Sequence, residues 1–147
     1  MTIPIGAWCA SLLFDLASLR SAEPRVFARG ASELVKTGIA GGAVAAVFGF
    51  LDYLKIPKRS VAGVTATAHL ALNVTTIALY AVNVGQRETR LRADDTRDAP
   101  VSPNAIGLSL LALSLLGASG WLGGMLSYSF GVRVADEATQ AESLHRI

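Results

Sequence analysis

Four long apolar segments separated by polar stretches dominate the chain. They cover residues 3–19, 34–54, 61–84 and 105–130, and only three charged residues, Asp15, Lys36 and Asp52, fall inside them. A charge at the centre of a bilayer costs about 3 kcal/mol on insertion scales, so this segregation is typical of helices that cross a membrane. The pattern predicts an all-α, integral membrane four-helix bundle, built as a single four-span domain over residues 1–147.

Polar residues of the third segment recur at helical spacing. Steps of three or four positions separate Thr65, His69, Asn73, Thr76, Tyr80 and Asn83. Residues at these spacings share one helix face. Because polar groups without partners are costly in hydrocarbon, we expect this face to point into the bundle. Two interpretations stay open, namely hydrogen bonds between helices or a pocket for a ligand, proton or cofactor around His69.

Two carboxylates are further interior polar candidates. Asp52 lies near the end of the second segment, and His69 lies eight residues into the third from the same side of the membrane, which leaves an axial gap of about 9 Å. One water or a tilted helix would close this gap. Asp15 lies near the opposite side. Each carboxylate has an ordinary alternative, which is to reach the headgroups or to pair with a Lys or Arg of a loop.

Small residues mark the second and fourth segments at the spacing that lets helix backbones approach closely. The members are Gly38, Gly42, Ala46 and Gly49 in one segment and Gly117, Gly120, Gly124, Ser127 and Gly131 in the other. We interpret both series as helix-packing seams.

Several classes of function are disfavoured. The net charge is only +2 and there is no long basic run, so nucleic acid is not an expected partner. Cys9 is the single cysteine, which excludes an intramolecular disulfide or a paired-thiol redox motif. No nucleophile elbow, HExxH zinc motif or phosphate-binding glycine loop occurs. We therefore favour a non-enzymatic protein without a metal site.

The positive-inside rule gives an orientation. With four spans, the 13 Lys and Arg residues divide into eight on one side and five on the other. The larger group includes the basic residues of the segment 85–104, which we expect to be a solvated loop. The count predicts that both termini lie outside the cell.

Four stretches of the chain carry a family resemblance. They are IPIGAW followed by LLFD over residues 3–15, the run from Gly41 that ends in FGFLD at Asp52, the intramembrane His69, and GWLGGMLSYSFGVRV over residues 120–134. On these motifs the chain resembles the DUF2231 family of predicted bacterial membrane proteins. The resemblance implies a multi-pass protein of the plasma membrane with a four-span bundle and unassigned activity. The family-like positions are Asp15, Asp52, His69, Trp121, Gly123, Gly124, Tyr128 and Gly131.

Three functions follow from the residues and the resemblance together. The resemblance extends to relatives joined to Rieske-type iron–sulfur domains, which suggests an accessory subunit or module of a membrane redox complex. Separately, four helices of this length leave only one narrow interior, which suggests a homodimer in the lipid bilayer. A second hypothesis is a b-type haem protein for electron transfer with His69 as axial ligand, in which the other ligand comes from another residue type or another chain. A third is a proton or solute pathway through Asp52, His69 and Asn73.

Overall fold

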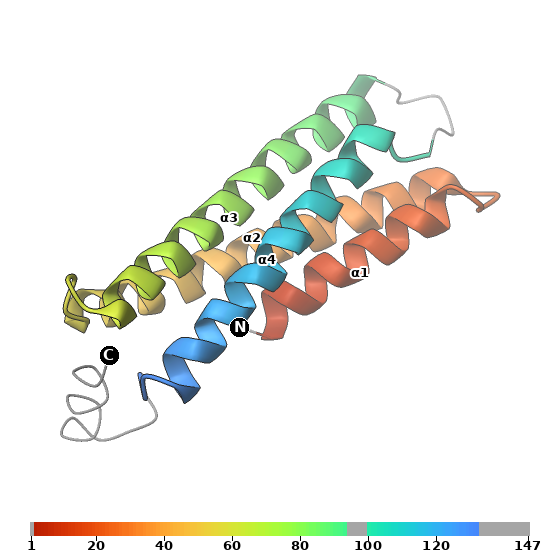
Figure 1. The fold of residues 1–147 in the computed structure, drawn as a ribbon. Helices are drawn as coiled ribbons and strands as arrows, with labels where there is room; N and C mark the ends of the chain where they lie inside the picture. Colours follow the sequence, from red (N-terminus) through yellow and green to blue (C-terminus); the bar gives the residue numbers. More distant parts are fainter. Residues whose placement is uncertain (1, 94–99, 133–147) are drawn as a thin grey trace. The chain divides into compact units, whose positions relative to one another are not determined.

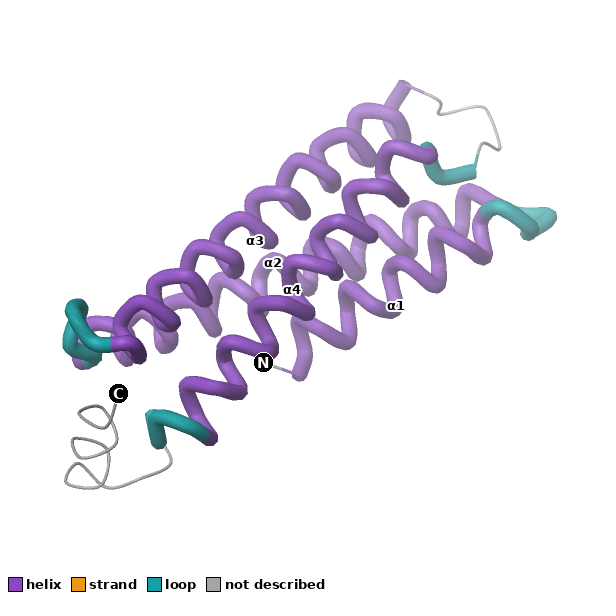
Figure 2. The backbone as a smooth tube through the Cα atoms, viewed as in Figure 1, coloured by secondary structure: helices purple, strands orange, loops and turns teal. Residues whose placement is uncertain are grey.

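The computed structural model describes residues 2–93 and 100–132. Four helices follow one another in these ranges, α1 (Thr2–Ser18), α2 (Pro24–Lys55), α3 (Val61–Ala93) and α4 (Pro103–Tyr128), coloured in chain order in Figure 1. The described residues contain no strand (Figure 2). The all-α fold class predicted from the sequence is confirmed.

The helix ends follow local rules. Ser60 caps α3, because its hydroxyl accepts the backbone N–H of Gly63 and its carbonyl accepts that of Val64. Both α2 and α4 begin with a proline, which suits the first turn because its nitrogen has no hydrogen to satisfy. After α4, Gly131 adopts a left-handed φ of 66°, and the next amide bonds back to the carbonyl of Leu126.

Two helices are longer than the apolar pattern indicates. α2 begins at Pro24 instead of residue 34, and α3 continues to Ala93 instead of ending at residue 84. The predicted loop over residues 85–104 is therefore wrong for residues 85–93 and 103–104, while residues 94–99 lie outside the described ranges. The added turns hold each other through polar groups. Ser32 Oγ donates to Glu88 Oε1 at 2.7 Å, and Lys36 Nζ lies 3.0 Å from the same oxygen.

Three of the helices, α2, α3 and α4, are long and apolar enough to cross a membrane. Helix α1 is apolar but has 17 residues, which give a rise of about 25 Å against a hydrocarbon core of about 30 Å. In the most apolar windows of the three long helices, only 11% to 22% of the residues are buried within the protein. Most of their apolar surface therefore faces outward, as lipid requires.

The chain divides into two compact units. Unit 1 comprises residues 1–45 and 75–114, and unit 2 comprises residues 46–74 and 115–147. Unit 1 thus contains α1 and parts of the other three helices, whereas unit 2 contains the remaining parts of α2, α3 and α4. Each unit is described below by itself.

Small and polar residues form much of the buried interior. In unit 1 the fully buried positions of α2 include Ala31, Ser32 and Val35, and those of α4 include Ala105 and Ser109. Short side chains bring helix backbones close together, which is how helices associate where burial of apolar surface gives no advantage over lipid. The main apolar cluster of unit 2 follows the same principle with some larger members, and it consists of Ile56, Ala62, Ala66, Leu126 and Phe130.

Candidate functional site

The inward face of α3 carries most of the interior polar chemistry. In unit 1 its buried residues Thr76, Tyr80, Asn83 and Arg87 are spaced by four, three and four positions. In unit 2, His69 continues the same spacing pattern and is half-buried. The structure therefore places most of the predicted polar stripe on inward faces, and extends it by one turn to Arg87.

A buried ion pair is the centre of the network in unit 1. The two terminal nitrogens of Arg87 donate to the two carboxylate oxygens of Asp15, each at 2.6 Å. The side chains are 3% and 0% exposed, so neither charge reaches water or headgroups. This fork-to-fork geometry is the strongest arrangement available to a guanidinium and a carboxylate. It joins α1 to α3 inside unit 1.

Asn83 extends this network to α4. Its side-chain oxygen accepts the Nε–H of Arg87, and its amide nitrogen donates to the carbonyl of Ala105 at 2.9 Å and to the hydroxyl of Ser109 at 3.0 Å. Every polar atom of the Asn83 side chain is thus used. We call Asp15, Arg87, Asn83 and Ser109 the charged network. It is neutral overall and ties three helices together.

Unit 2 contains an uncharged network around His69. The ring Nδ1 lies 2.8 Å from the carbonyl oxygen of Ser119, which can only accept, so we assign the ring proton to Nδ1. The other nitrogen, Nε2, then accepts from the amide of Asn73 at 3.1 Å. The same amide donates to the Ser119 hydroxyl at 2.8 Å. We call His69, Asn73 and Ser119 the histidine network, and it joins α3 to α4.

One glycine of the fourth segment makes room for this histidine. A Cβ built on Gly123 would lie 3.0 Å from the Cε1 atom of His69, closer than such contacts normally are. The ring therefore packs against the backbone of α4 between Ser119 and Gly123, which are one turn apart. This contact explains one position of the GWLGG motif in physical terms.

An aromatic stack lies beside the charged network in unit 1. The rings of Trp8 and Tyr80 are nearly parallel, with centroids 4.4 Å apart. Gly38 and Gly42 of α2 lie against the indole of Trp8, and a Cβ on Gly38 would overlap it. The predicted glycine seam of α2 therefore packs closely at these two positions. In contrast, a Cβ on Gly49 would contact nothing within 4 Å.

Three buried donors of unit 1, two of them on the stacked rings, have no hydrogen-bond partner in the described part of the chain. They are the indole nitrogen of Trp8 and the hydroxyls of Thr76 and Tyr80. A buried donor without an acceptor costs about 1–3 kcal/mol. At Thr76 and Tyr80, the polar stripe of α3 therefore fills space in the interior without forming side-chain hydrogen bonds.

Two polar candidates, Thr65 and Asp52, remain. Thr65 donates its hydroxyl to the carbonyl of Val61 in its own helix, at 3.0 Å. Asp52 is half-buried on α2 in unit 2.

The family-like residues of the last motif, which lie between residues 120 and 131, divide into two groups. Gly123 contacts His69, and Gly131 ends the last helix with its left-handed backbone. Trp121 and Tyr128 instead expose 74% and 89% of their surface, and a Cβ on Gly124 would meet nothing within 4 Å. The predicted seam on this segment is therefore wrong as an internal contact at Gly117, Gly120 and Gly124, all of which face open space.

The position of the internal seam of α4 explains this correction. The buried residues of the helix are Ala105, Ser109, Ala112, Ser119 and Leu126, and the series continues to Phe130. Small residues occur on both the buried and the outward faces, so their spacing alone does not identify the packed face.

The geometry limits the ways in which cofactors can bind. Haem ligation requires one ring nitrogen of His69 to be free, whereas both are hydrogen-bonded. Axial ligation through Nε2 would therefore require the contact with Asn73 to be broken, while the Nδ1–H bond to the Ser119 carbonyl could remain. The described residues contain no group of three His, Cys, Asp or Glu side chains that could hold a metal ion.

The fold and its networks define a helical membrane protein with a small-residue interior and an apolar outer surface. More specifically, the chain belongs to the family described as "Predicted membrane protein (DUF2231)", whose model matches residues 1–136. The resemblance seen in the sequence motifs is thereby confirmed. No curated protein and no solved structure matches the chain.

Proposed function

We propose that this chain is a non-enzymatic accessory module of a membrane complex, which docks onto a neighbouring membrane helix through the outward face of α4. The observation that carries the proposal is the outward face formed by Gly117, Trp121, Gly124 and Tyr128, spaced by four, three and four positions, where both aromatic side chains are exposed and both glycines border open space. Two large aromatic side chains alternate there with two glycines. None of the four is required for packing within the described chain.

Such a face suits a helix partner. Glycines let a second helix approach the backbone of α4, and the aromatic side chains then supply contact area on either side. An aromatic belt at the membrane surface is the competing explanation for Trp121 and Tyr128. That explanation does not account for the open positions of Gly117 and Gly124 on the same face. The family resemblance suggests that the partner helix belongs to a membrane redox complex. A second copy of the chain is the alternative partner.

The two polar networks support an accessory role over catalysis. The donors and acceptors around His69 and around Asp15 satisfy each other within their own unit. A proton pathway requires groups that exchange partners, and a haem site requires a free ligand atom. Both networks are instead suited to holding helices together.

Photo-crosslinking in membranes of the cells that make the protein tests the docking face. A benzophenone amino acid replaces Tyr128, and in a control protein it replaces Phe50, which is 47% exposed on α2. We expect one discrete adduct from position 128. Gly124→Leu should abolish it, whereas Gly49→Leu, at an equally open glycine, should not. Absence of the adduct, or its survival in Gly124→Leu, contradicts the proposal.

Spectroscopy and flux measurements test the competing functions. The purified protein, expressed with ample haem, is compared with His69→Ala in reduced-minus-oxidised absorption spectra. We expect a featureless spectrum from both, and equal proton flux in liposomes. A haem band that vanishes in His69→Ala would replace the accessory role by electron transfer, and a flux lost in that variant would replace it by a transport pathway.

A further inference from the structure

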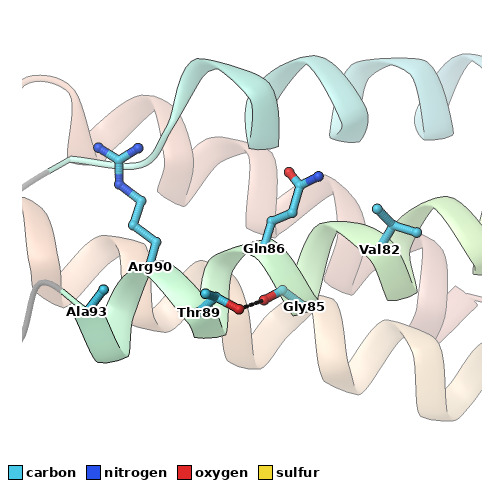
Figure 3. A pocket seen from close by; sticks show the side chains of 6 residues that line it. All are labelled: Val82, Gly85, Gln86, Thr89, Arg90 and Ala93. Atoms are coloured by element: carbon cyan, nitrogen blue, oxygen red, sulfur yellow. Dashed lines mark hydrogen bonds between the residues drawn. The ribbon is translucent and has the colours of Figure 1, made fainter.

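We propose that a groove on the outer surface of α3 binds one anionic phospholipid. The groove is shallow and wide open, with a volume of about 640 Å³, and is lined by residues of α3 alone, all in unit 1, namely Val82, Gly85, Gln86, Thr89, Arg90 and Ala93 (Figure 3). This inference is independent of the docking face on α4, which lies in unit 2.

The lining residues are apolar at one end and polar in the middle. Val82 and Gly85 form the apolar end, Gln86 and Arg90 follow over the next two turns, and Ala93 lies beyond them. From Val82 to Arg90 the helix rises by about 12 Å. A phospholipid has the same order, with acyl chains next to a phosphate. Figure 3 shows the side chains of Gln86 and Arg90 extending from the same side of α3 as Val82.

Gly85 keeps the groove open. A Cβ at this position would meet nothing within 4 Å, so a larger side chain would occupy the groove without disturbing the packing of the helices. Thr89 uses its hydroxyl hydrogen on the carbonyl of Gly85, at 2.9 Å (Figure 3). The donors that remain for a phosphate are therefore the amide of Gln86 and the guanidinium of Arg90.

Within the described residues, Arg90 differs from Arg87 and Lys36 in its ion pairs. Asp15 neutralises Arg87, and Glu33 and Glu88 flank Lys36. Arg90 is exposed and makes no ion pair with any residue in the ranges that the structure describes. A guanidinium matches two phosphate oxygens at once, and an added positive charge favours anionic over zwitterionic lipids. The occupant expected from this charge is an anionic phospholipid.

Native mass spectrometry of the full chain in a mild detergent tests the proposal. The protein is titrated with dioleoylphosphatidylglycerol, dioleoylphosphatidylcholine or inorganic phosphate. We expect the wild-type protein to retain one phosphatidylglycerol in preference to phosphatidylcholine. Arg90→Gln should weaken this binding about fivefold, which is the effect of one basic side chain near the membrane surface. Gly85→Leu should weaken it at least as much, because the leucine fills the groove.

Two matched variants serve as controls. Arg20→Gln removes an exposed arginine outside the groove, and Gly107→Leu fills open space on α4. Both should bind phosphatidylglycerol within about twofold of the wild type, the ordinary scatter for surface changes. All four variants should keep the unfolding temperature of the wild type without lipid, because the substituted positions are exposed.

Three results would overturn the lipid site. The first is equal retention of phosphatidylglycerol by the wild type and Arg90→Gln, or by the wild type and Gly85→Leu. The second is equal retention of phosphatidylcholine, which would mean that charge does not select the occupant. The third is displacement of the lipid by millimolar inorganic phosphate, which would identify the groove as a site for the free anion.

Discussion

The charged network of unit 1 and the histidine network of unit 2 both join helices, but only the first does so with charged side chains. Both tie α3 to α4 through polar side chains. In unit 1, Arg87 and Asp15 are almost fully buried, and Arg87 donates two short hydrogen bonds to Asp15. In unit 2, His69 is half-buried, and we assign it as neutral.

The difference between the two networks shows that the free-energy cost of losing a polar partner depends on charge in a protein that faces lipid. Removing one member of a buried ion pair leaves the other charge without compensation, which costs far more than losing a neutral hydrogen bond. We therefore expect the charged network to tolerate substitution less than the histidine network does. The predictions below test this ranking, from the largest effect to the smallest.

Arg87→Leu should have the largest effect. It leaves the carboxylate of Asp15 buried and unpaired, and we expect a loss of about 3–5 kcal/mol in the free energy of unfolding. Reversible unfolding in mixed detergent micelles, followed by far-ultraviolet circular dichroism, measures this loss. Arg20→Leu, at an exposed arginine, is the control and should change the free energy by about 0.5 kcal/mol or less.

A double variant separates the unpaired charge from lost packing. Asp15→Leu combined with Arg87→Leu removes both charges and should recover most of the stability lost in Arg87→Leu, because an apolar pair of similar volume replaces a buried ion pair at little cost. If the double variant is as unstable as Arg87→Leu, the uncompensated charge is not the cause.

His69→Leu should destabilise the protein by about 1–2 kcal/mol. The substitution removes both ring hydrogen bonds and leaves the Ser119 carbonyl and the Asn73 amide with fewer partners. The same unfolding measurement applies. A loss as large as that of Arg87→Leu would contradict the ranking of the two networks.

Ser119→Ala should cost about 0.6 kcal/mol, the average for one hydrogen bond between membrane helices. The carbonyl of this residue, which accepts from His69, is unaffected by the change. Ser114→Ala is a suitable control, because that hydroxyl bonds only within its own helix. Equal effects of the two substitutions would indicate that the Ser119 hydroxyl does not join the helices.

Tyr80→Phe should have the smallest effect and leave the protein as stable as the wild type, or slightly more stable. Its hydroxyl is buried without a partner among the described residues, so its removal eliminates a desolvation cost while the stack on Trp8 remains. A loss above about 1 kcal/mol in the unfolding measurement would show that the hydroxyl has an acceptor.

Much of the interior was predictable from spacing. The 3–4 pattern of polar residues in the third segment placed His69, Asn73 and Tyr80 together on one helix face, where the structure has them. Arg87 was missed because the apolar segment ends at residue 84. Its signal was present, since Arg87 is four positions after Asn83 and continues the same spacing. For Asp15, a Lys or Arg was one of the expected partners. The spacing of residues within one helix does not identify which residue of another helix that partner is.

The sequence by itself determined that this is a helical membrane protein, because charged residues must be kept apart from a lipid solvent. It also determined the helix ends at Ser60 and Gly131, whose causes are local. Only the tertiary structure decided which face of α4 is internal, since that helix is apolar and rich in small residues all round. It also decided that Arg87 pairs with Asp15, because that choice depends on which helices become neighbours.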